Sequence, residues 1–430
     1  MPRDPIAVPA VEDRGVLRFL TCGSVDDGKS TLIGRLLFDT KVLLADTLAN
    51  LQRSADRRGL SAPDLALLTD GLSAEREQGI TIDVAYRYFA TAQRKFIIAD
   101  APGHEQYTRN MVTAASTADV AVLLIDARKG VLTQTRRHAT LAALLGIRRL
   151  ILAVNKMDLV GFEAARFAAI ETEFRTWLAQ HRELHVELQA VPLSALDGDM
   201  VVERGTRLDW YRGPTLIELL ESVPAAEDAI DAPLRLPVQW VCRPGSTGER
   251  GYAGRIESGR LRVGDEIAVQ PGGLRSRVIR IALGTDELAQ AVAGQSVMLS
   301  LADERDISRG DLLVQAGDAT APRAAFGATL CWLDAAALSP ARSYLLRQAT
   351  RTVKARIARA DGPEGGKLDL HTLAWNGAGD DAIGLNDIAR VQVRTQQPLL
   401  ADAYRALRAT GSFVLIDEAS NNTVAAGVID

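Results

Sequence analysis

The chain has 430 residues, of which 47% are hydrophobic and 24% are charged, and its formal net charge at pH 7 is -4. This composition is typical of a globular protein with about two to four domains, and it excludes a disordered or fibrous class. The small acidic excess argues against a large nucleic-acid footprint. No apolar run in the sequence is long enough to span a membrane.

The amino terminus and the cysteines indicate where the protein is located. Residues 1–14 contain prolines and acids where a signal peptide needs an apolar stretch, so we expect them to form a flexible arm. The three cysteines, Cys22, Cys242 and Cys331, lie far apart and lack metal-ligand spacing, which favours free thiols in a reducing compartment. We therefore expect a cytoplasmic protein.

Between residues 15 and 224, strand-like apolar runs alternate with helical patterns. This alternation predicts an α/β domain with a mostly parallel sheet, in which ligands bind at the carboxyl ends of the strands. The predicted strands are Val16–Cys22, Lys95–Asp100, Val120–Asp126, Arg149–Asn155 and Val186–Ser194. The predicted helices include Ser30–Phe38, Thr133–Leu145 and Ala164–His181.

After residue 224 the composition changes. Acids and prolines in residues 225–237 predict a linker, and short β-rich runs broken by glycines predict one β barrel in residues 238–317 and another in residues 318–430. The predicted strands are Val238–Arg243, Gly251–Ile256, Asp265–Val269, Ser276–Ile281, Ser296–Leu301, Ala328–Leu333, Thr352–Ile357, Leu368–Trp375, Ile388–Val393 and Ser412–Ile416.

A phosphate-binding motif joins the first predicted strand to the first predicted helix. Its Gly-x4-Gly-Lys-Ser/Thr spacing covers Gly23, Ser24, Val25, Asp26, Asp27, Gly28, Lys29, Ser30 and Thr31. The glycines let backbone amides turn toward the phosphates, Lys29 reaches the β and γ phosphates, and the Ser30 hydroxyl ligates Mg²⁺. The α/β domain is therefore predicted to bind a nucleoside triphosphate with Mg²⁺.

A second motif follows the strand Lys95–Asp100 and contains Asp100, Ala101, Pro102, Gly103 and His104. We expect Asp100 to hold the metal and the Gly103 amide to approach the γ phosphate, so that loss of this phosphate releases the segment. His104 is the candidate for orienting the attacking water. The same residues are also ordinary turn formers, which is the structural alternative.

A third motif lies in residues 75–83, which read Glu-Arg-Glu-Gln-Gly-Ile-Thr-Ile-Asp. Thr81 is the candidate for a second switch that ligates Mg²⁺ while the γ phosphate is present. Val25 and Ile80 are candidates for an apolar gate in front of His104. The alternatives are a solvated helix end around Thr81 and ordinary loop packing for the two apolar residues.

Two further segments predict which base is bound. Asn155, Lys156, Met157 and Asp158 follow a strand, and the Asp158 carboxylate can accept hydrogen bonds from guanine N1 and N2, which adenine does not offer. After the last strand of the domain come Ser194, Ala195 and Leu196, where we expect a backbone amide near guanine O6. The predicted nucleotide is GTP.

These motifs resemble those of the translation-factor-type GTPases, in which a G domain precedes two β barrels. Within that superfamily the chain is similar to the large, GTP-hydrolysing subunit of sulfate adenylyltransferase (ATP sulfurylase). The stretches that carry the resemblance are Gly23–Leu37, Ala74–Phe89, Lys95–Met111, Ile125–His138 and Asn155–Leu159, followed by the less specific Gly251–Ile267 and Phe413–Gly427.

The resemblance implies a function. In that family a small catalytic subunit joins ATP and sulfate to give adenosine 5'-phosphosulfate and pyrophosphate, and the large subunit hydrolyses GTP to drive this unfavourable reaction. We therefore expect a heteromer with the small adenylyltransferase subunit and no nucleic-acid or membrane partner. Ala101 stands where threonine is common in the family. We also expect no adenylylsulfate kinase domain of the kind fused to some members.

Two alternatives stay open at the level of sequence. An elongation factor that carries aminoacyl-tRNA has the same layout and predicts a basic carboxyl-terminal surface, but residues 318–430 hold 12 Lys plus Arg and 12 Asp plus Glu, a net charge of zero. A regulatory GTP-dependent switch without useful turnover is the other alternative, and the presence of His104 counts against it.

Overall fold

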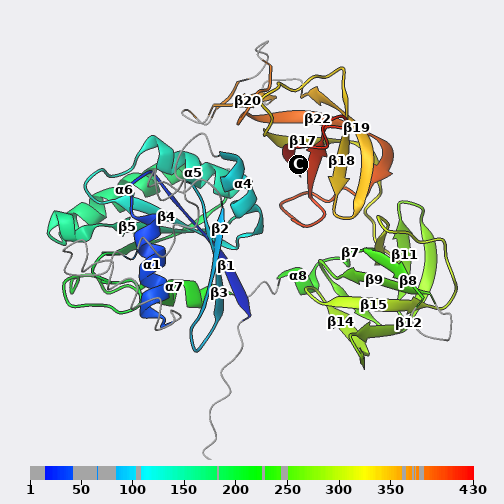
Figure 1. Ribbon diagram of the computed structural model, residues 1–430, viewed down its shortest axis with the longest axis horizontal. Coiled ribbons are helices and arrows are strands. Elements are labelled where there is room, and N and C mark those ends of the chain that lie inside the picture. Colours follow the sequence, from blue (N-terminus) through cyan, green and yellow to red (C-terminus); the bar gives the residue numbers. More distant parts are fainter. Residues whose placement is uncertain are drawn as a thin grey trace, which may run out of the picture. The chain divides into compact units, whose positions relative to one another are not determined.

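The computed structural model describes residues 15–41, 65, 84–102, 108–181, 184–224, 228–243, 250–360, 365–369, 372, 374–376 and 382–430. The chain divides into two compact units, Met1–Ala225 and Ala226–Asp430 (Figure 1). The predicted arm of residues 1–14 lies outside the described residues, as do Ile80, Thr81, Gly103 and His104.

The first unit contains a six-stranded sheet, as far as its described residues show, in the order β2-β3-β1-β4-β5-β6. Its strands are β1 (Val16–Gly23), β2 (Ala85–Ala90), β3 (Lys95–Asp100), β4 (Val120–Asp126), β5 (Arg149–Asn155) and β6 (Glu187–Pro192). All neighbouring pairs are parallel except β2 and β3. This confirms the predicted α/β class, and it adds the edge strand β2, in which one residue is buried and Arg87 interrupts the apolar residues.

Among the described residues of this unit, three helical elements correspond to the predicted helices, and three others have no predicted counterpart. They are α1 (Lys29–Asp39), α4 (Thr108–Thr117), α5 (Thr133–Leu144), the 3₁₀ turn η3 (Met157–Val160), α6 (Ala164–Gln180) and α7 (Leu216–Ser222). Helix α1 buries Leu32, Ile33, Leu36 and Leu37 on one face. Because this face packs into the core, the amino terminus of α1 is held at the carboxyl end of β1.

The second unit begins with helix α8 (Asp228–Asp231) and an antiparallel sheet. The sheet order is β7-β16-β11-β12-β15-β9-β8, with β13 beside β12, and β10 pairs with β14. The bounds are β7 (Leu236–Pro237), β8 (Trp240–Cys242), β9 (Gly251–Arg255), β10 (Arg260–Arg262), β11 (Glu266–Gln270), β12 (Leu274–Leu283), β13 (Asp286–Glu287), β14 (Gln290–Val292), β15 (Ser296–Leu301) and β16 (Leu312–Gln315). Their inward side chains form one apolar cluster.

The predicted linker is therefore only partly irregular. Residues 228–231 form α8, and residues 236–237 form β7, which pairs with β16. Leu234 and Leu236 are fully buried in the apolar cluster of this first antiparallel sheet. Prolines and acids surround these leucines in the sequence, so the local composition concealed a short segment that is held by tertiary packing.

A second antiparallel sheet completes this unit, with the strand order β17-β24-β23-β18-β19-β22-β20-β21. An additional pairing of β17 with β22 closes six of its strands into a ring (Figure 1). The bounds are β17 (Arg323–Trp332), β18 (Ser343–Gln348), β19 (Arg351–Arg359), β20 (Gly366–Leu368), β21 (Trp375–Asn376), β22 (Ile388–Leu399), β23 (Ser412–Ile416) and β24 (Thr423–Ile429).

The prediction of one strand over Leu368–Trp375 is wrong. Leu368 ends β20 and Trp375 begins β21, and the two residues face each other in an antiparallel pair. Alternating apolar and polar residues over a short stretch give the same sequence pattern in a hairpin as in a strand. Only the pairing of the two strands distinguishes them.

A buried arginine links the two sheets of the second unit. Arg235 is 1% exposed, and its Nε and Nη2 each donate to the Asp402 carboxylate at 2.8 Å, while Nη1 donates to Asp318. Burial alone would lower the pKa of Arg235, but these carboxylates raise it. Thr410 also donates to Asp402, at 2.6 Å. This network connects the segment before β7 with the loops that flank the second sheet.

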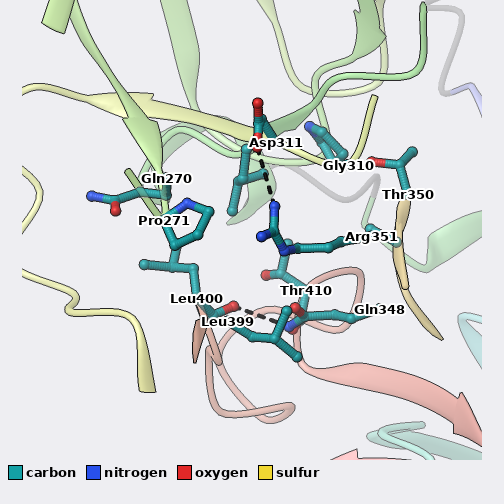
Figure 2. Close-up of a pocket in the computed structure, with 13 residues that line it drawn as sticks. Gln270, Pro271, Gly310, Asp311, Gln348, Thr350, Arg351, Leu399, Leu400 and Thr410 are labelled. Atoms are coloured by element: carbon teal, nitrogen blue, oxygen red, sulfur yellow. Dashed lines mark hydrogen bonds and ion pairs between the residues drawn. The ribbon is translucent and has the colours of Figure 1, made fainter. Parts of the chain in front are cut away.

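The two sheets also meet at a small crevice that is shown in Figure 2. Arg351 of β19 lies 3.1 Å from Asp311, and the Gln348 side chain donates to the Leu400 carbonyl at 3.0 Å. Leu400 packs against Ala268 and Val314 of the other sheet. Apolar contact and ion pairing therefore act together at this joint.

We predict that Arg235→Ala lowers the free energy of unfolding of the full chain by about 3–5 kcal/mol, because it leaves two carboxylates buried without their cation. Urea unfolding followed by tryptophan fluorescence measures the change. The matched control is Arg277→Ala, which removes an exposed ion pair with Glu266 and is expected to cost no more than about 1 kcal/mol. Equal losses in the two variants would contradict the role given to Arg235.

Candidate functional site

The strand order brings the predicted motifs to one edge of the sheet. Thr21 of β1 is in register with Asp100 of β3, and Asp126 of β4 is in register with Asn155 of β5. Because these strands are parallel, their carboxyl ends lie at the same edge. The loops that follow β1, β3, β5 and β6 therefore start side by side.

The phosphate loop turns sharply into helix α1. Gly28 has φ 96° and is the amino-terminal cap of α1, and Asp26 also has a positive φ of 66°. A Cβ on Gly28 would collide with the Asn155 side-chain amide, and one on Gly23 would come within 2.8 Å of the Leu124 carbonyl oxygen. Both glycines are thus required by close approach as well as by backbone conformation.

Lys29 lies over this loop and is almost fully buried. Its Nζ donates to the carbonyl oxygens of Gly23 at 3.1 Å and Ser24 at 2.9 Å. Burial lowers the pKa of Lys29, and the negative charges of Asp100 and Asp27 oppose that change. The ammonium group is therefore held at the start of α1, where anionic ligands are favoured.

The Asp27 side chain forms a hydrogen bond within the phosphate loop. Its Oδ2 accepts a hydrogen bond of 2.7 Å from the Ser24 amide, and its side chain is 1% exposed. Burial raises the pKa of Asp27, although the Ser24 amide and the charge of Lys29 act in the opposite direction. Its Oδ1 has no hydrogen-bond partner among the described residues.

Asn155 connects the phosphate loop to the predicted base-binding loops. Its Nδ2 donates to the Asp27 carbonyl at 2.8 Å, and its Oδ1 accepts from the Ala195 amide at 2.9 Å. The Ser194 hydroxyl donates to the Asp158 carboxylate at 2.8 Å. Asp158 and residues 194–196 are thus brought together, while Met157 points into the core and Leu196 is exposed.

Sequence reasoning gave no role to Asp126, which ends β4 at the same edge. Its carboxylate lies 3.1 Å from Lys156 Nζ and accepts hydrogen bonds from the Arg128 amide and guanidinium. Burial alone would raise the pKa of Asp126, but these donors lower it overall. Lys156 also donates to the Asp26 carbonyl, so the Lys156–Asp126 ion pair connects β4 to the phosphate loop. An acid at the end of a buried strand was the available signal.

Arg35 of α1 is a second residue without a predicted role. Its Nε donates to the Ala195 carbonyl at 3.2 Å, and its Nη2 donates to the Leu196 carbonyl. The loop after β6 is therefore held by Arg35 of α1 as well as by Asn155. No sequence motif signals this contact, because the two segments are 160 residues apart.

The predicted metal ligands are placed in part. Ser30 is the second residue of α1, and Asp100 ends β3, where it is buried and accepts a hydrogen bond of 3.1 Å from Thr21 Oγ1. A hydroxyl and a carboxylate are the hard oxygen ligands that Mg²⁺ prefers. Ala101 and Pro102 are buried directly after Asp100. Thr81, Gly103 and His104 lie outside the described residues.

Comparison with known proteins identifies the family. The Elongation factor Tu GTP binding domain family matches residues 14–228, and the GTP-eEF1A C-terminal domain-like family matches residues 325–430. Sulfate adenylyltransferase subunit 1 of Shewanella oneidensis is 48% identical over 423 residues, which are 97% of this chain and 86% of that protein. The chain belongs to the sulfate adenylyltransferase subunit 1 family. The predicted relationship is thereby confirmed.

Longer relatives share the same region. The Bifunctional enzyme CysN/CysC of Mycobacterium tuberculosis (strain ATCC 25618 / H37Rv) is 50% identical over 96% of this chain, and the Bifunctional enzyme NodQ of Rhizobium sp. (strain N33) is 50% identical over 99% of it. These matches cover 67% and 65% of the two relatives. The chain thus spans about two thirds of the bifunctional proteins. In its described part, no helix is long and apolar enough to cross a membrane.

We predict that Asn155→Ala weakens GTP binding by about tenfold to a hundredfold, since each buried group left without its partner costs about 1–3 kcal/mol. Titration with a fluorescent GTP analogue measures the dissociation constant. Gln189→Ala, an exposed position on β6 of the same domain, is the control and should leave that constant unchanged. If Asn155→Ala binds as tightly as the parent chain, the bonds to Asp27 and Ala195 do not hold the site together.

Proposed function

We propose that this chain is the GTP-hydrolysing subunit of sulfate adenylyltransferase. GTP hydrolysis here would drive the formation of adenosine 5'-phosphosulfate from ATP and sulfate on a small catalytic partner subunit in sulfate assimilation. The observation that carries the proposal is the bonded connection from the phosphate loop through Asn155 to residues 194–196, in a chain of this family.

The phosphate end of the site would bind the triphosphate through the residues of the loop. Lys29 would exchange its two carbonyl partners for β and γ phosphate oxygens, and the amides of residues 23–31 would donate to the phosphates. Ser30, Thr81 and Asp100 would hold Mg²⁺, directly or through water. The metal would supply charge neutralisation between the β and γ phosphates.

The base end of the site supports guanine. The Asp158 carboxylate is oriented by the Ser194 hydroxyl at one oxygen, Oδ1, and its four lone-pair sites leave capacity for guanine N1 and N2. A backbone amide of residues 194–196 would donate to guanine O6. Adenine would leave the carboxylate without these partners, which is unfavourable.

Hydrolysis would depend on the switch residues. We assign His104 to the orientation of the attacking water, Gly103 to a backbone contact with the γ phosphate, and Val25 with Ile80 to a gate that controls access of His104. Thr81 and Gly103 would lose their ligand when the γ phosphate leaves. Coupling then requires that the partner subunit interacts differently with the two switch states, because only a differential interaction shifts an equilibrium.

The coupling is tested by mixing the chain with the small adenylyltransferase subunit, ATP and sulfate and following GTP hydrolysis. We expect the hydrolysis rate to rise only when the partner and both substrates are present. Lys29→Met is the negative control, because it removes the phosphate-binding ammonium group. A rate that the partner and substrates leave unchanged would overturn the coupling, and the absence of turnover in every mixture would favour a binding switch.

Base selectivity has a separate test. Asp158→Asn replaces one acceptor oxygen of the carboxylate by an NH₂ donor. We predict that the variant's nucleotide preference shifts from GTP toward xanthosine triphosphate. The difference between the two binding free energies should change by at least about 1–3 kcal/mol. Competition between the two nucleotides for a fluorescent analogue measures the preference. Asp197→Asn, in the neighbouring loop, serves as the control of equal charge change. An unaltered preference in Asp158→Asn would remove this residue from base recognition.

A further inference from the structure

Two arginines face each other on the outside of the closed sheet in the second unit. Arg356 of β19 is directly opposite Arg394 of β22, and both side chains are exposed. The same row continues to Ser343 on β18 and to Ala325 on β17. The strands β18, β19 and β22 lie side by side in Figure 1.

This arrangement is unfavourable for the isolated chain. Like charges directly opposite each other on neighbouring antiparallel strands are destabilising. Neither Arg356 nor Arg394 has an acidic partner in the described part of the chain. Other basic residues of this sheet do have such partners: Arg342 with Asp417, Lys354 with Glu418, Arg351 with Asp311 and Lys367 with Asp387.

The residues around the pair leave it accessible. Ser343 and Ala325 flank it within its row, and the adjoining row pairs Ala358 with Gln392. These side chains are short or neutral and are exposed. The other adjoining row holds Lys354, whose charge is paired with Glu418. Arg347 of β18 lies on the same outer face and is likewise exposed. We call Arg347, Arg356 and Arg394 the arginine face.

The chemistry of the arginine face indicates its ligand. Directly opposed residues have Cβ atoms about 4.5–5.5 Å apart, and each planar guanidinium can bind one carboxylate through two parallel hydrogen bonds. Two neighbouring carboxylates of an acidic protein surface would satisfy both arginines and remove their mutual repulsion. An RNA footprint needs a wider basic surface, whereas residues 318–430 have no net charge.

We propose that the arginine face is a docking surface for an acidic patch of the small adenylyltransferase subunit. The proposal rests on the proposed function, because that function requires this partner. Exposed charges at an interface act mainly by accelerating association, and salt screens them. Complex formation through this face should therefore be sensitive to ionic strength.

The test is the double variant Arg356→Gln/Arg394→Gln in the full chain, titrated with the small subunit by calorimetry at low and high salt. At low salt we expect the double variant to bind the small subunit with a dissociation constant at least about tenfold above that of the parent chain. At high salt the two dissociation constants should be closer to each other. The thermal midpoint should be equal to or above that of the parent chain, because the repulsion is removed. GTP affinity should stay unchanged.

The matched control is Arg275→Gln, at an exposed arginine on β12 of the other sheet, which should bind the partner like the parent chain. Binding by the double variant within about twofold of the parent chain would overturn the proposal, as would an equal loss in the control. Salt-sensitive binding of a short RNA that is lost in the double variant, with partner binding retained, would also overturn it. If the parent chain binds the partner but its GTP hydrolysis is not stimulated, and the double variant loses that binding, the result would instead contradict the proposed function alone.

Discussion

The G domain depends on the two hydrogen bonds of one buried amide. Asn155 donates to the Asp27 carbonyl and accepts from the Ala195 amide, so it joins loops that follow β1, β5 and β6. Asn155 is buried, so water does not replace the partners of its Nδ2 and Oδ1 atoms when these bonds are lost. The bonds are therefore costly to break. Gly28 has no side chain at the point where this amide passes. The shape of the phosphate loop and the position of the loop of residues 194–196 are thereby set together.

The surrounding charges strengthen the same connection. Asp126 holds Lys156 beside the phosphate loop, and Arg35 holds the loop of residues 194–196 from α1. Lys29 is buried while its partners are carbonyl oxygens, an arrangement that an arriving phosphate can replace with stronger, charge-assisted bonds. The site is therefore preorganised for an anion at one end and leaves an oriented carboxylate, Asp158, at the other.

The second unit uses buried charge differently. Arg235 and its two carboxylates connect the sheets through buried ion pairs, and removal of one partner would leave the others without compensation. The arginine face shows the reverse situation, since its charges are exposed and lack acidic partners in the described structure. The first arrangement stabilises the chain itself, and the second is suited to association.

The sequence by itself determined the α/β domain, the loop between its first strand and first helix, and the family, because each depends on local spacing or on a contiguous motif. It also placed the strands β15 and β23 at their observed bounds, since their short β-rich runs are marked by local residues. Only the tertiary structure decided what joins distant segments. The roles of Asn155, Asp126 and Arg35, the hairpin of β20 and β21, and the Arg356–Arg394 pair arise from strand order and register. Apart from the hairpin, whose two strands lie within one short stretch that reads equally as a single strand, the partners of these contacts are too far apart in the sequence for a local periodicity to reveal them.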